Sequence, residues 1–391
     1  MRLGVTIRTL DGKTTELVVA DGHFRAPDQM APDVELDTSQ WWAIPGLADC
    51  HAHLSSNQVS MVDEEGDLLD RARANAWAQL EGGVFLVADK GTSDDVSLRV
   101  LDEPPTRRPD LRLASRIITS PGGYFPGFGH EVSEAELVDA VRRAAGAAEG
   151  RATWVKLIGD WPKRGVGPTP NFAQEAMARA AEVAHAAGCR VAIHTCAPVT
   201  PTLAVEAGID SIEHGLFLTV DDIEALGRRG GAWVPTIAAM EATRDELGPQ
   251  SSGGRLFARG LDNVRELLAG APEAGVSVLA GTDLQLAHGA VATEALRLGA
   301  YGLSATQVVE ALTTTAYDYM GASWSFEPGA HADVVFLDAD PREDITTLGR
   351  PVLALRHGEA VVGRPLLASA GASASARASA SSGAPEPGAT H

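Results

Sequence analysis

Two histidines one residue apart, His51 and His53, follow the apolar segment 43–48. Side chains two positions apart on extended backbone point to the same side, so both imidazole rings can reach one metal ion. Buried histidines with purely structural hydrogen bonds produce this pattern about as often. The pair therefore raises the question of a metal site, and further ligands are needed to answer it.

Four further polar residues, Lys156, His194, His214 and Asp283, stand in or directly after other short apolar segments. Taken singly, each has an ordinary explanation, because a strand-end histidine is usually structural and a lysine usually reaches solvent or an ion pair. A lysine inside an apolar strand is nevertheless costly to bury unless something uses it. Six such residues in equivalent places are improbable by chance, and together they predict a metal site.

Short apolar segments alternate with helical patterns over residues 43–325. The eight candidate strands are Ala43–Asp49, Val84–Asp89, Leu113–Thr119, Trp154–Ile158, Arg190–His194, Ser211–His214, Ala232–Thr236 and Ser277–Thr282. The candidate helices between them include Val132–Ala148, Asn171–Ala187, Asp221–Arg229 and Arg255–Ala274. This order predicts an α/β fold, a (β/α)8 TIM barrel, in which catalytic groups sit at the C-terminal ends of the strands. A doubly wound open sheet is the main alternative, but no GxGxxG follows an early strand.

The two ends of the chain have a different pattern. Residues 1–42 indicate short strands around the Asp11-Gly12 turn, and residues 326–366 indicate short strands around His357-Gly358. We expect the two ends to pair into one small β-sandwich domain. Residues 367–391 are mostly Ala, Ser, Gly and Pro, and they are predicted to be disordered because they cannot bury enough apolar surface.

Composition restricts the partners. The formal net charge is −20 over 391 residues, and such an acidic chain repels nucleic acid and anionic membrane surfaces. Three cysteines give no disulfide framework, and neither a signal peptide nor an apolar run of ~18 residues is present. We therefore expect a cytoplasmic protein with a small-molecule substrate, no nucleic-acid partner and no membrane association.

The strand-end motifs together resemble the amidohydrolase superfamily. Its first-strand signature, Pro-Gly-x-x-Asp-x-His-x-His, stands at 45–53. Glu213-His214-Gly215, Gly281-Thr282-Asp283 with His288-Gly289, and the segment 327–333 also match. The resemblance covers about residues 1–365, and Lys156 makes the chain similar to the binuclear branch with prolidase-like and imidazolonepropionase-related enzymes.

This resemblance implies a centre of two divalent metal ions. Lys156 matches a lysine that the family carboxylates with CO2, because a carbamate can bridge two cations and an ammonium group cannot. One ion would be bound by His51, His53, Asp283 and the carbamate, and the other by the carbamate, His194 and His214. Such ligands suit Zn2+ and are also compatible with Mn2+, Co2+ or Fe2+.

The resemblance also implies a mechanism. A hydroxide bridging the two ions attacks a polarised carbonyl, and Asp283 carries the proton to the leaving amine. The expected substrate is a dipeptide or an N-acyl amino acid, as for prolidase-like enzymes.

Two loops are candidates for binding this substrate. In the loop 120–130, which is rich in Gly and aromatic residues, Tyr124 or His130 is predicted to bind an oxyanion or a substrate carboxylate. In the loop 159–165, Lys163 or Arg164 is predicted to bind a substrate carboxylate. Packing of the first loop and solvation of the second pair explain these residues equally well.

Other functions remain open. A deaminase of the same superfamily typically has a glutamate near the fifth-strand histidine, but here Thr195-Cys196-Ala197-Pro198 follows His194. Cyclic amide hydrolysis, as in imidazolonepropionase, uses the same chemistry and stays possible. A non-catalytic scaffold usually lacks one or more ligands, whereas all six positions are filled here. Such hydrolases often form homo-oligomers, although no heptad pattern points to an interface.

Overall fold

A computed structural model describes residues 2–57, 67–163 and 166–369 of the chain. The chain divides into two compact units. The small unit consists of Met1–Pro45, Trp324–Asp340 and Arg350–His391, and the large unit of Gly46–Ser323 and Pro341–Gly349. All six predicted metal ligands belong to the large unit, so the site is described within that unit alone.

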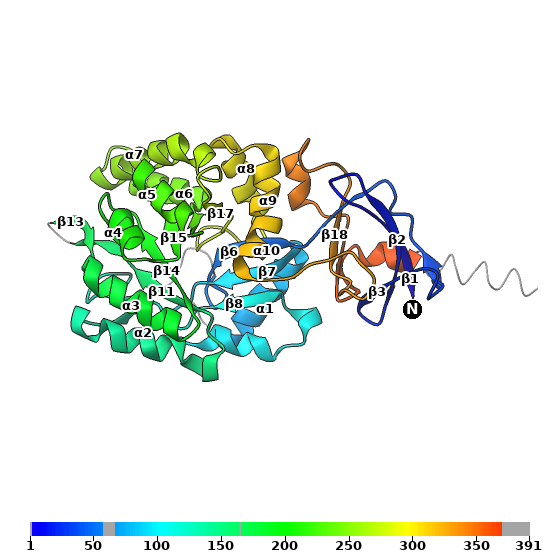
Figure 1. The fold of residues 1–391 in the computed structure, drawn as a ribbon, viewed down its shortest axis with the longest axis horizontal. Coiled ribbons are helices and arrows are strands. Elements are labelled where there is room, and N and C mark those ends of the chain that lie inside the picture. Colours follow the sequence, from blue (N-terminus) through cyan, green and yellow to red (C-terminus); the bar gives the residue numbers. More distant parts are fainter. Residues whose placement is uncertain (1, 58–66, 164–165, 370–391) are drawn as a thin grey trace, which may run out of the picture. The chain divides into compact units, whose positions relative to one another are not determined.

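Parallel strands form the centre of the large unit (Figure 1). One sheet has the order β6-β7-β8, and a second has the order β10-β9-β11-β14-β15-β16-β17. The strands of the first sheet are β6 (Leu47–Ala52), β7 (Val84–Asp89) and β8 (Asp110–Leu113). Those of the second are β9 (Ile118–Thr119), β10 (His130–Glu131), β11 (Trp154–Ile158), β14 (Arg190–Thr195), β15 (Ser211–His214), β16 (Ala232–Val234) and β17 (Ser277–Val278). The short strands β12 (Asp160–Lys163) and β13 (Gly167–Pro170) form a separate antiparallel hairpin.

Backbone contacts link the two parallel sheets at both of their edges. An isolated parallel bridge joins Ala114, just after β8, to Trp154 of β11. At the other edge, the amide of Cys50 in β6 donates to the carbonyl of Ala280, just after β17, over 2.8 Å. The C-terminal ends of these parallel strands therefore meet at one end of the unit, where the polar residues lie.

Helices flank these strands (Figure 1). They are α1 (Leu68–Glu81), α2 (Leu137–Ala145), α3 (Gln174–Ala186), α4 (Thr200–Glu206), α5 (Val220–Arg228), α6 (Ile237–Leu247), α7 (Ser252–Leu267), α8 (Ala292–Ala300), α9 (Ala305–Ala311) and α10 (Thr314–Met320). Several of these helices follow a residue whose side chain accepts hydrogen bonds from amides of the first helical turn, which have no partner within the helix. Asp67 caps α1, and Thr219 and Ser304 start capping boxes at α5 and α9. Among the described residues, no helix is long and apolar enough to cross a membrane.

The small unit contains two four-stranded sheets, one in the order β3-β2-β1-β4 and one in the order β20-β19-β18-β5. Their strands are β1 (Leu3–Arg8), β2 (Thr14–Ala20), β3 (His23–Arg25), β4 (Val34–Glu35), β5 (Trp42–Ile44), β18 (Val334–Leu337), β19 (Leu353–Arg356) and β20 (Glu359–Val362). Residues of both sheets share one core cluster, which includes Val5 and Phe24 from the first sheet and Phe336 and Leu355 from the second.

Strand bounds differ from the predicted ones in two informative places. The predicted strand Ala43–Asp49 is two strands, because β5 belongs to the small unit and β6 to the large one. Pro45 lacks an amide hydrogen and so cannot donate a hydrogen bond within a sheet. At Gly46, a Cβ atom would lie 2.2 Å from the Phe85 ring, so any side chain would collide with it. Pro45-Gly46 therefore ends one strand and lets the next pack closely on β7. The predicted strand Leu113–Thr119 is likewise interrupted, with β8 ending at Leu113 and β9 starting at Ile118.

Candidate metal centre

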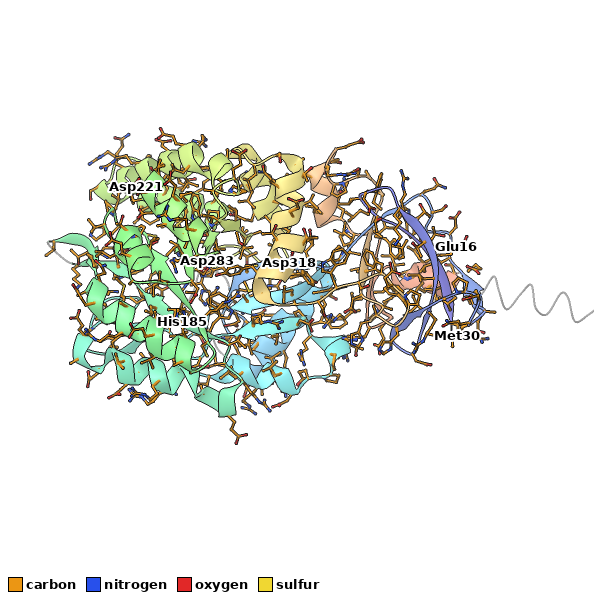
Figure 2. All side chains as sticks on the ribbon, viewed as in Figure 1. Glu16, Met30, His185, Asp221, Asp283 and Asp318 are labelled. Carbon is orange, nitrogen blue, oxygen red and sulfur yellow. The ribbon has the colours of Figure 1, made fainter. Side chains whose placement is uncertain are left out.

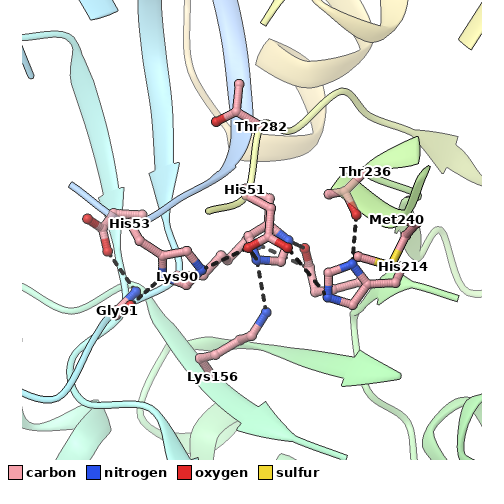
Figure 3. A network of polar contacts seen from close by, with 12 residues as sticks. His51, His53, Lys90, Gly91, Lys156, His214, Thr236, Met240 and Thr282 are labelled. Carbon is pink, nitrogen blue, oxygen red and sulfur yellow. Dashed lines mark hydrogen bonds and ion pairs between the residues drawn. The ribbon is translucent and has the colours of Figure 1, made fainter. Parts of the chain in front are cut away.

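Five of the six predicted ligands meet at the strand ends. Figure 3 shows His51, His53, Lys156 and His214 close together, and Asp283, which is labelled in Figure 2, contacts the three histidines. Asp283 Oδ1 lies 3.5 Å from His51 Nε2 and 3.4 Å from His53 Nε2, and Oδ2 lies 4.0 Å from His214 Nε2. Lys156 Nζ lies 3.3 Å from His51 Nε2. These groups come from β6, β11, β15 and the segment after β17, so the sheet topology brings together residues that are far apart in sequence.

The sixth predicted ligand, His194 at the end of β14, lies beside His214, with ring centroids 4.5 Å apart. Two groups of candidate metal-ligating atoms result, in each of which all the atoms lie within 4.8 Å of one another. One group is His51, His53 and Asp283, and the other is His194, His214 and Cys196. The structure thus places the thiol of Cys196 within reach of the second group.

Two of the histidines are oriented by hydrogen bonds at their other ring nitrogen. His53 Nδ1 donates to the Gly91 carbonyl over 2.5 Å. His214 Nδ1 lies 2.7 Å from the Thr236 hydroxyl, which itself donates to the Pro235 carbonyl and so accepts from the ring. A proton on Nδ1 leaves the Nε2 lone pair facing the centre, which is the arrangement of metal-binding histidines.

The third histidine, His51, is oriented by a carboxylate that the sequence analysis did not assign. Its Nδ1 lies 2.7 Å from Glu213 Oε2, in a close polar contact that is not an in-line hydrogen bond. Burial, with repulsion from Lys156, lowers the pKa of His51 to about 3. Burial also lowers the pKa of His214 to about 4. Both rings are therefore neutral at neutral pH, as a metal ligand must be.

The backbone at the site adopts conformations that most residues avoid. The φ value is 63° at His214 and 54° at Asp283. It is 46° at Thr236, which hydrogen-bonds to the His214 ring. Left-handed backbone at a residue other than glycine costs on the order of 1–3 kcal/mol and is frequent at functional sites. Here it turns the side chains of His214 and Asp283 toward the centre.

Asp49 holds the Asp283 segment against β6. Its carboxylate accepts the Thr282 amide over 3.0 Å, the Thr282 hydroxyl over 2.6 Å and the Gln79 side-chain amide over 2.9 Å. Gly281 permits this approach, because a Cβ there would lie only 2.6 Å from His51 Cβ. The Asp of the first-strand signature is therefore a structural anchor for Asp283.

The two ionisable groups on either side of His51, Lys156 and Asp283, both have lowered pKa values, but for different reasons. Burial, only partly offset by the nearby Glu213, lowers the pKa of Lys156 to about 8. Burial alone would raise the pKa of Asp283, but His51, His53 and His214 hold it well below its usual range. Asp283 is thus ionised at neutral pH, while part of the Lys156 population is a neutral amine.

Aromatic side chains adjoin the centre on the side of the loop 120–130. Tyr124 and Phe128 are buried in a cluster with the partly buried Trp161. The rings of Tyr124 and Trp161 each lie 5.9 Å from that of His194, and the Phe128 ring lies 6.1 Å from that of His53. Burial, with repulsion from Asp283, raises the pKa of Tyr124 well above its usual value, so its hydroxyl stays protonated.

The other predicted substrate-binding residues are not brought into this cluster. His130 is exposed on β10, and no contact joins it to the ligands within the described chain. Lys163 ends β12 and is partly exposed. Arg164 lies outside the described residues, as do residues 370–391 of the predicted disordered tail 367–391. The first three residues of that tail, 367–369, are helical instead, and Leu367 packs against the core of the small unit.

Besides Glu213, the sequence analysis also missed Lys90, which is fully buried and lies 3.3 Å from Glu213 Oε1. The signal was present, because Lys90 follows the apolar strand β7 in the way that the other site residues follow theirs. Glu213 stands next to His214, and adjacent residues of a strand point to opposite sides, so the pattern of strand-end ligands does not single it out.

Comparison with known proteins decides the family. The model of the amidohydrolase family matches residues 42–361. The chain belongs to this family. It is therefore an amidohydrolase, a metal-binding hydrolase that acts on carbon–nitrogen bonds.

Relatives and solved structures agree with this assignment. The amidohydrolase is 32% identical over 362 residues to uncharacterised proteins of Mycobacterium tuberculosis and Mycobacterium bovis, covering 89% of this chain and 92% of theirs. Its fold is similar to that of a Xaa-Pro dipeptidase with bound methionine, with a TM-score of 0.77, 21% identity, and 92% and 99% of the two chains covered. It is also similar to the fold of an A. niger ochratoxinase, with a TM-score of 0.73, 19% identity, and 93% and 96% covered.

Proposed function

We propose that this amidohydrolase binds two divalent metal ions, with Zn2+ as the best match, and hydrolyses the amide bond of a dipeptide or an N-acyl amino acid. The proposed ligands are His51, His53, Lys156, His194, His214 and Asp283. The observation that carries the proposal is the position of one carboxylate, that of Asp283, 3.4–4.0 Å from the Nε2 atoms of His51, His53 and His214.

The donor set fits divalent cations. Imidazole nitrogen and carboxylate oxygen are common zinc ligands, and the two candidate groups supply the protein ligands for two ions. The Nδ1 atoms of His53 and His214 are hydrogen-bonded and that of His51 faces Glu213, so the Nε2 atoms of all three rings point to the candidate centre. The ionised carboxylate of Asp283, beside the imidazole rings of His51, His53 and His214, also favours a bound cation.

Lys156 fits the role of a carboxylated lysine. A neutral amine attacks the carbon of CO2, an N–C bond forms, and the nitrogen releases a proton to leave an anionic carbamate. The lowered pKa of Lys156, about 8, supplies the neutral amine that this reaction needs near neutral pH. The carbamate would present two oxygen ligands at the point where an ammonium group would repel the metal ions.

The chemistry divides between the ions and the chain. Bound metal ions would polarise the substrate carbonyl and lower the pKa of a water molecule. Asp283 is ionised and central, so it can take the proton of the attacking water and deliver it to the leaving amine. Tyr124 keeps its hydroxyl proton and can donate a hydrogen bond to the oxygen that gains charge.

Fold details support the same assignment. We take the two parallel sheets as parts of one closed (β/α)8 barrel, which the contacts at both of their edges favour. We also take the two sheets of the small unit as a β-sandwich, which their shared core cluster favours. In such a barrel, strand-end residues form the active site.

The aromatic cluster favours substrates with an apolar side chain. Tyr124, Phe128 and Trp161 offer ring faces and edges beside His53 and His194, where the group next to the scissile bond would lie. The similar Xaa-Pro dipeptidase acts on peptides whose leaving group is proline, which is apolar as well. We therefore expect Xaa-Pro or N-acyl amino acid substrates with large apolar groups to be preferred over charged ones.

The test is amine release from a library of dipeptides, N-acyl amino acids and cyclic amides, using zinc-loaded protein prepared with bicarbonate. We expect cleavage of apolar linear substrates, loss of activity in Lys156→Ala, and a KM increase of about 10-fold in Trp161→Ala for apolar substrates. The matched control is Trp324→Ala, which changes an exposed tryptophan of the small unit. If only cyclic amides are hydrolysed, the proposed substrate class changes to cyclic amides. If no substrate class is hydrolysed, the proposed function is wrong.

A further inference from the structure

A buried ion pair adjoins the candidate metal centre, and Figure 3 shows its lysine, Lys90. Lys90 and Glu213 are both fully buried, and Lys90 Nζ lies 3.3 Å from Glu213 Oε1. The same ammonium group lies 3.9 Å from the centre of the Trp154 ring, and the Ser211 hydroxyl donates to Glu213 Oε1 over 2.6 Å. The pair is thus enclosed by protein.

Burial of two charges is expensive, and a buried ion pair is often no more stable than an apolar pair of the same size. The burial of Lys90 and Glu213 together therefore points to a role other than stability. The other oxygen of Glu213 supplies one, because it lies 2.7 Å from Nδ1 of His51, whose Nε2 faces Lys156 and Asp283. A continuous chain of contacts thus runs from Lys90 through Glu213 to a proposed metal ligand.

Each member of the chain has a distinct electrostatic effect. The Glu213 carboxylate favours a proton on Nδ1 of His51, and this leaves the lone pair on Nε2. The Lys90 ammonium balances the Glu213 charge, so that the carboxylate does not add an uncompensated negative charge below the centre. Burial would raise the pKa of Glu213, but Lys90, His51 and Lys156 hold it well below its usual range.

We propose that Lys90 and Glu213 are a positioning pair that sets the metal affinity of the centre by fixing the tautomer and orientation of His51. The inference rests on the proposed metal site and assigns a role to two residues that are not ligands themselves. Outer partners of metal-binding histidines commonly change metal affinity by about 10- to 100-fold. An effect of this size is expected from Glu213, and a smaller one in the same direction from Lys90.

The experiment measures the Zn2+ dissociation constant of the full chain by competition with a chelator, together with the melting temperature. Glu213→Gln is expected to weaken Zn2+ binding by about 10- to 100-fold, because a neutral amide attracts the Nδ1 proton less. Lys90→Met is expected to weaken binding and also to lower the melting temperature, because it leaves Glu213 buried without its counter-charge.

The double variant, Lys90→Met with Glu213→Gln, separates positioning from folding. Removing both charges is expected to restore the melting temperature to near that of the wild type, while Zn2+ binding stays 10- to 100-fold weaker. The control is Arg356→Met, which disrupts an ion pair between the buried Arg356 and the partly exposed Asp333 in the small unit. This control should lose stability and keep the wild-type affinity.

A second readout follows the ring itself. Nitrogen-15 NMR of the metal-free protein should show His51 protonated at Nδ1 in the wild type and a mixture of tautomers in Glu213→Gln. Wild-type Zn2+ affinity and an unchanged tautomer in Glu213→Gln would overturn the inference. Failure of the wild type itself to bind Zn2+ would instead overturn the proposed function, so the two failures are distinguishable.

Discussion

The Thr282 hydroxyl donates a 2.6 Å hydrogen bond to the carboxylate of Asp49, although 233 positions separate the two residues. Asp49 stands two residues before His51, and Thr282 directly precedes Asp283. One hydrogen bond therefore couples the two chain segments that supply His51, His53 and Asp283. It explains in physical terms why an aspartate belongs to the first-strand signature.

Thr282→Val is expected to weaken metal binding without removing a ligand. Valine has nearly the shape of threonine but cannot donate, so Asp49 loses one hydrogen bond while Asp283 keeps its carboxylate. We expect about 10-fold weaker Zn2+ binding and a loss of about 1.5–3 kcal/mol in the free energy of unfolding. Chelator competition and urea unfolding measure the two effects. Thr313→Val is the control, because this buried threonine donates to the Val309 carbonyl in a helix, and its variant should lose stability alone.

Asp283→Asn is expected to separate binding from turnover. Asparagine keeps one oxygen ligand but cannot carry a proton between the water and the leaving amine. We expect metal content near that of the wild type and a kcat about 100- to 10,000-fold lower. Elemental analysis and steady-state kinetics on the best substrate test this, and a wild-type kcat would remove Asp283 from the proton-carrying role.

Carboxylation of Lys156 is expected to depend on pH. The pKa of Lys156 is about 8, so the neutral amine that reacts with CO2 decreases as the pH falls below this value. Metal-free protein equilibrated with carbon-13 bicarbonate should therefore show a carbamate signal at pH 8 that declines toward pH 6. Lys156→Ala should lack the signal, and Lys163→Ala, which changes a partly exposed lysine, should retain it. A signal of equal strength in Lys156→Ala would assign the carbamate to another residue.

Glu294 is expected to make the protein less stable as the pH rises. This fully buried carboxylate accepts the first amides of α6, from Ile237 over 2.6 Å and Ala238 over 2.9 Å. Burial nevertheless raises its pKa from 4.5 to about 8. Because the folded state then holds a proton that the unfolded state has released, stability falls as the pH rises between these two values.

The measurement is urea unfolding of wild-type and Glu294→Gln protein between pH 5 and 8. Glutamine cannot ionise, so the difference in the free energy of unfolding should shift in favour of the variant as the pH rises. Other buried carboxylates, such as Asp49 and Asp160, titrate equally in both proteins and cancel in this difference. A difference that does not change with pH would show that Glu294 is ionised throughout.

The sequence by itself determined the candidate ligands and the order of the elements. Burying a charged or imidazole side chain at the end of an apolar strand costs free energy unless the side chain has a partner. This cost singled out His51, His53, Lys156, His194, His214 and Asp283. Parallel strands separated by helices share their C-terminal edge, so the order of elements already implied that these residues meet. Helix starts at Asp67, Thr219 and Ser304 are local as well, because the capping side chain and its amides are neighbours in sequence.

Tertiary structure alone decided the partners behind those ligands. Three contacts join residues that lie on or directly after different strands: His51 with Glu213, Glu213 with Lys90, and Asp49 with Thr282. A single sequence does not show which side chains of neighbouring strands pack against one another. The left-handed backbone at His214 and Asp283 is likewise imposed by surrounding contacts, since local preference opposes it. Local energetic costs thus reveal which residues are unusual, whereas only three-dimensional packing determines which of them touch.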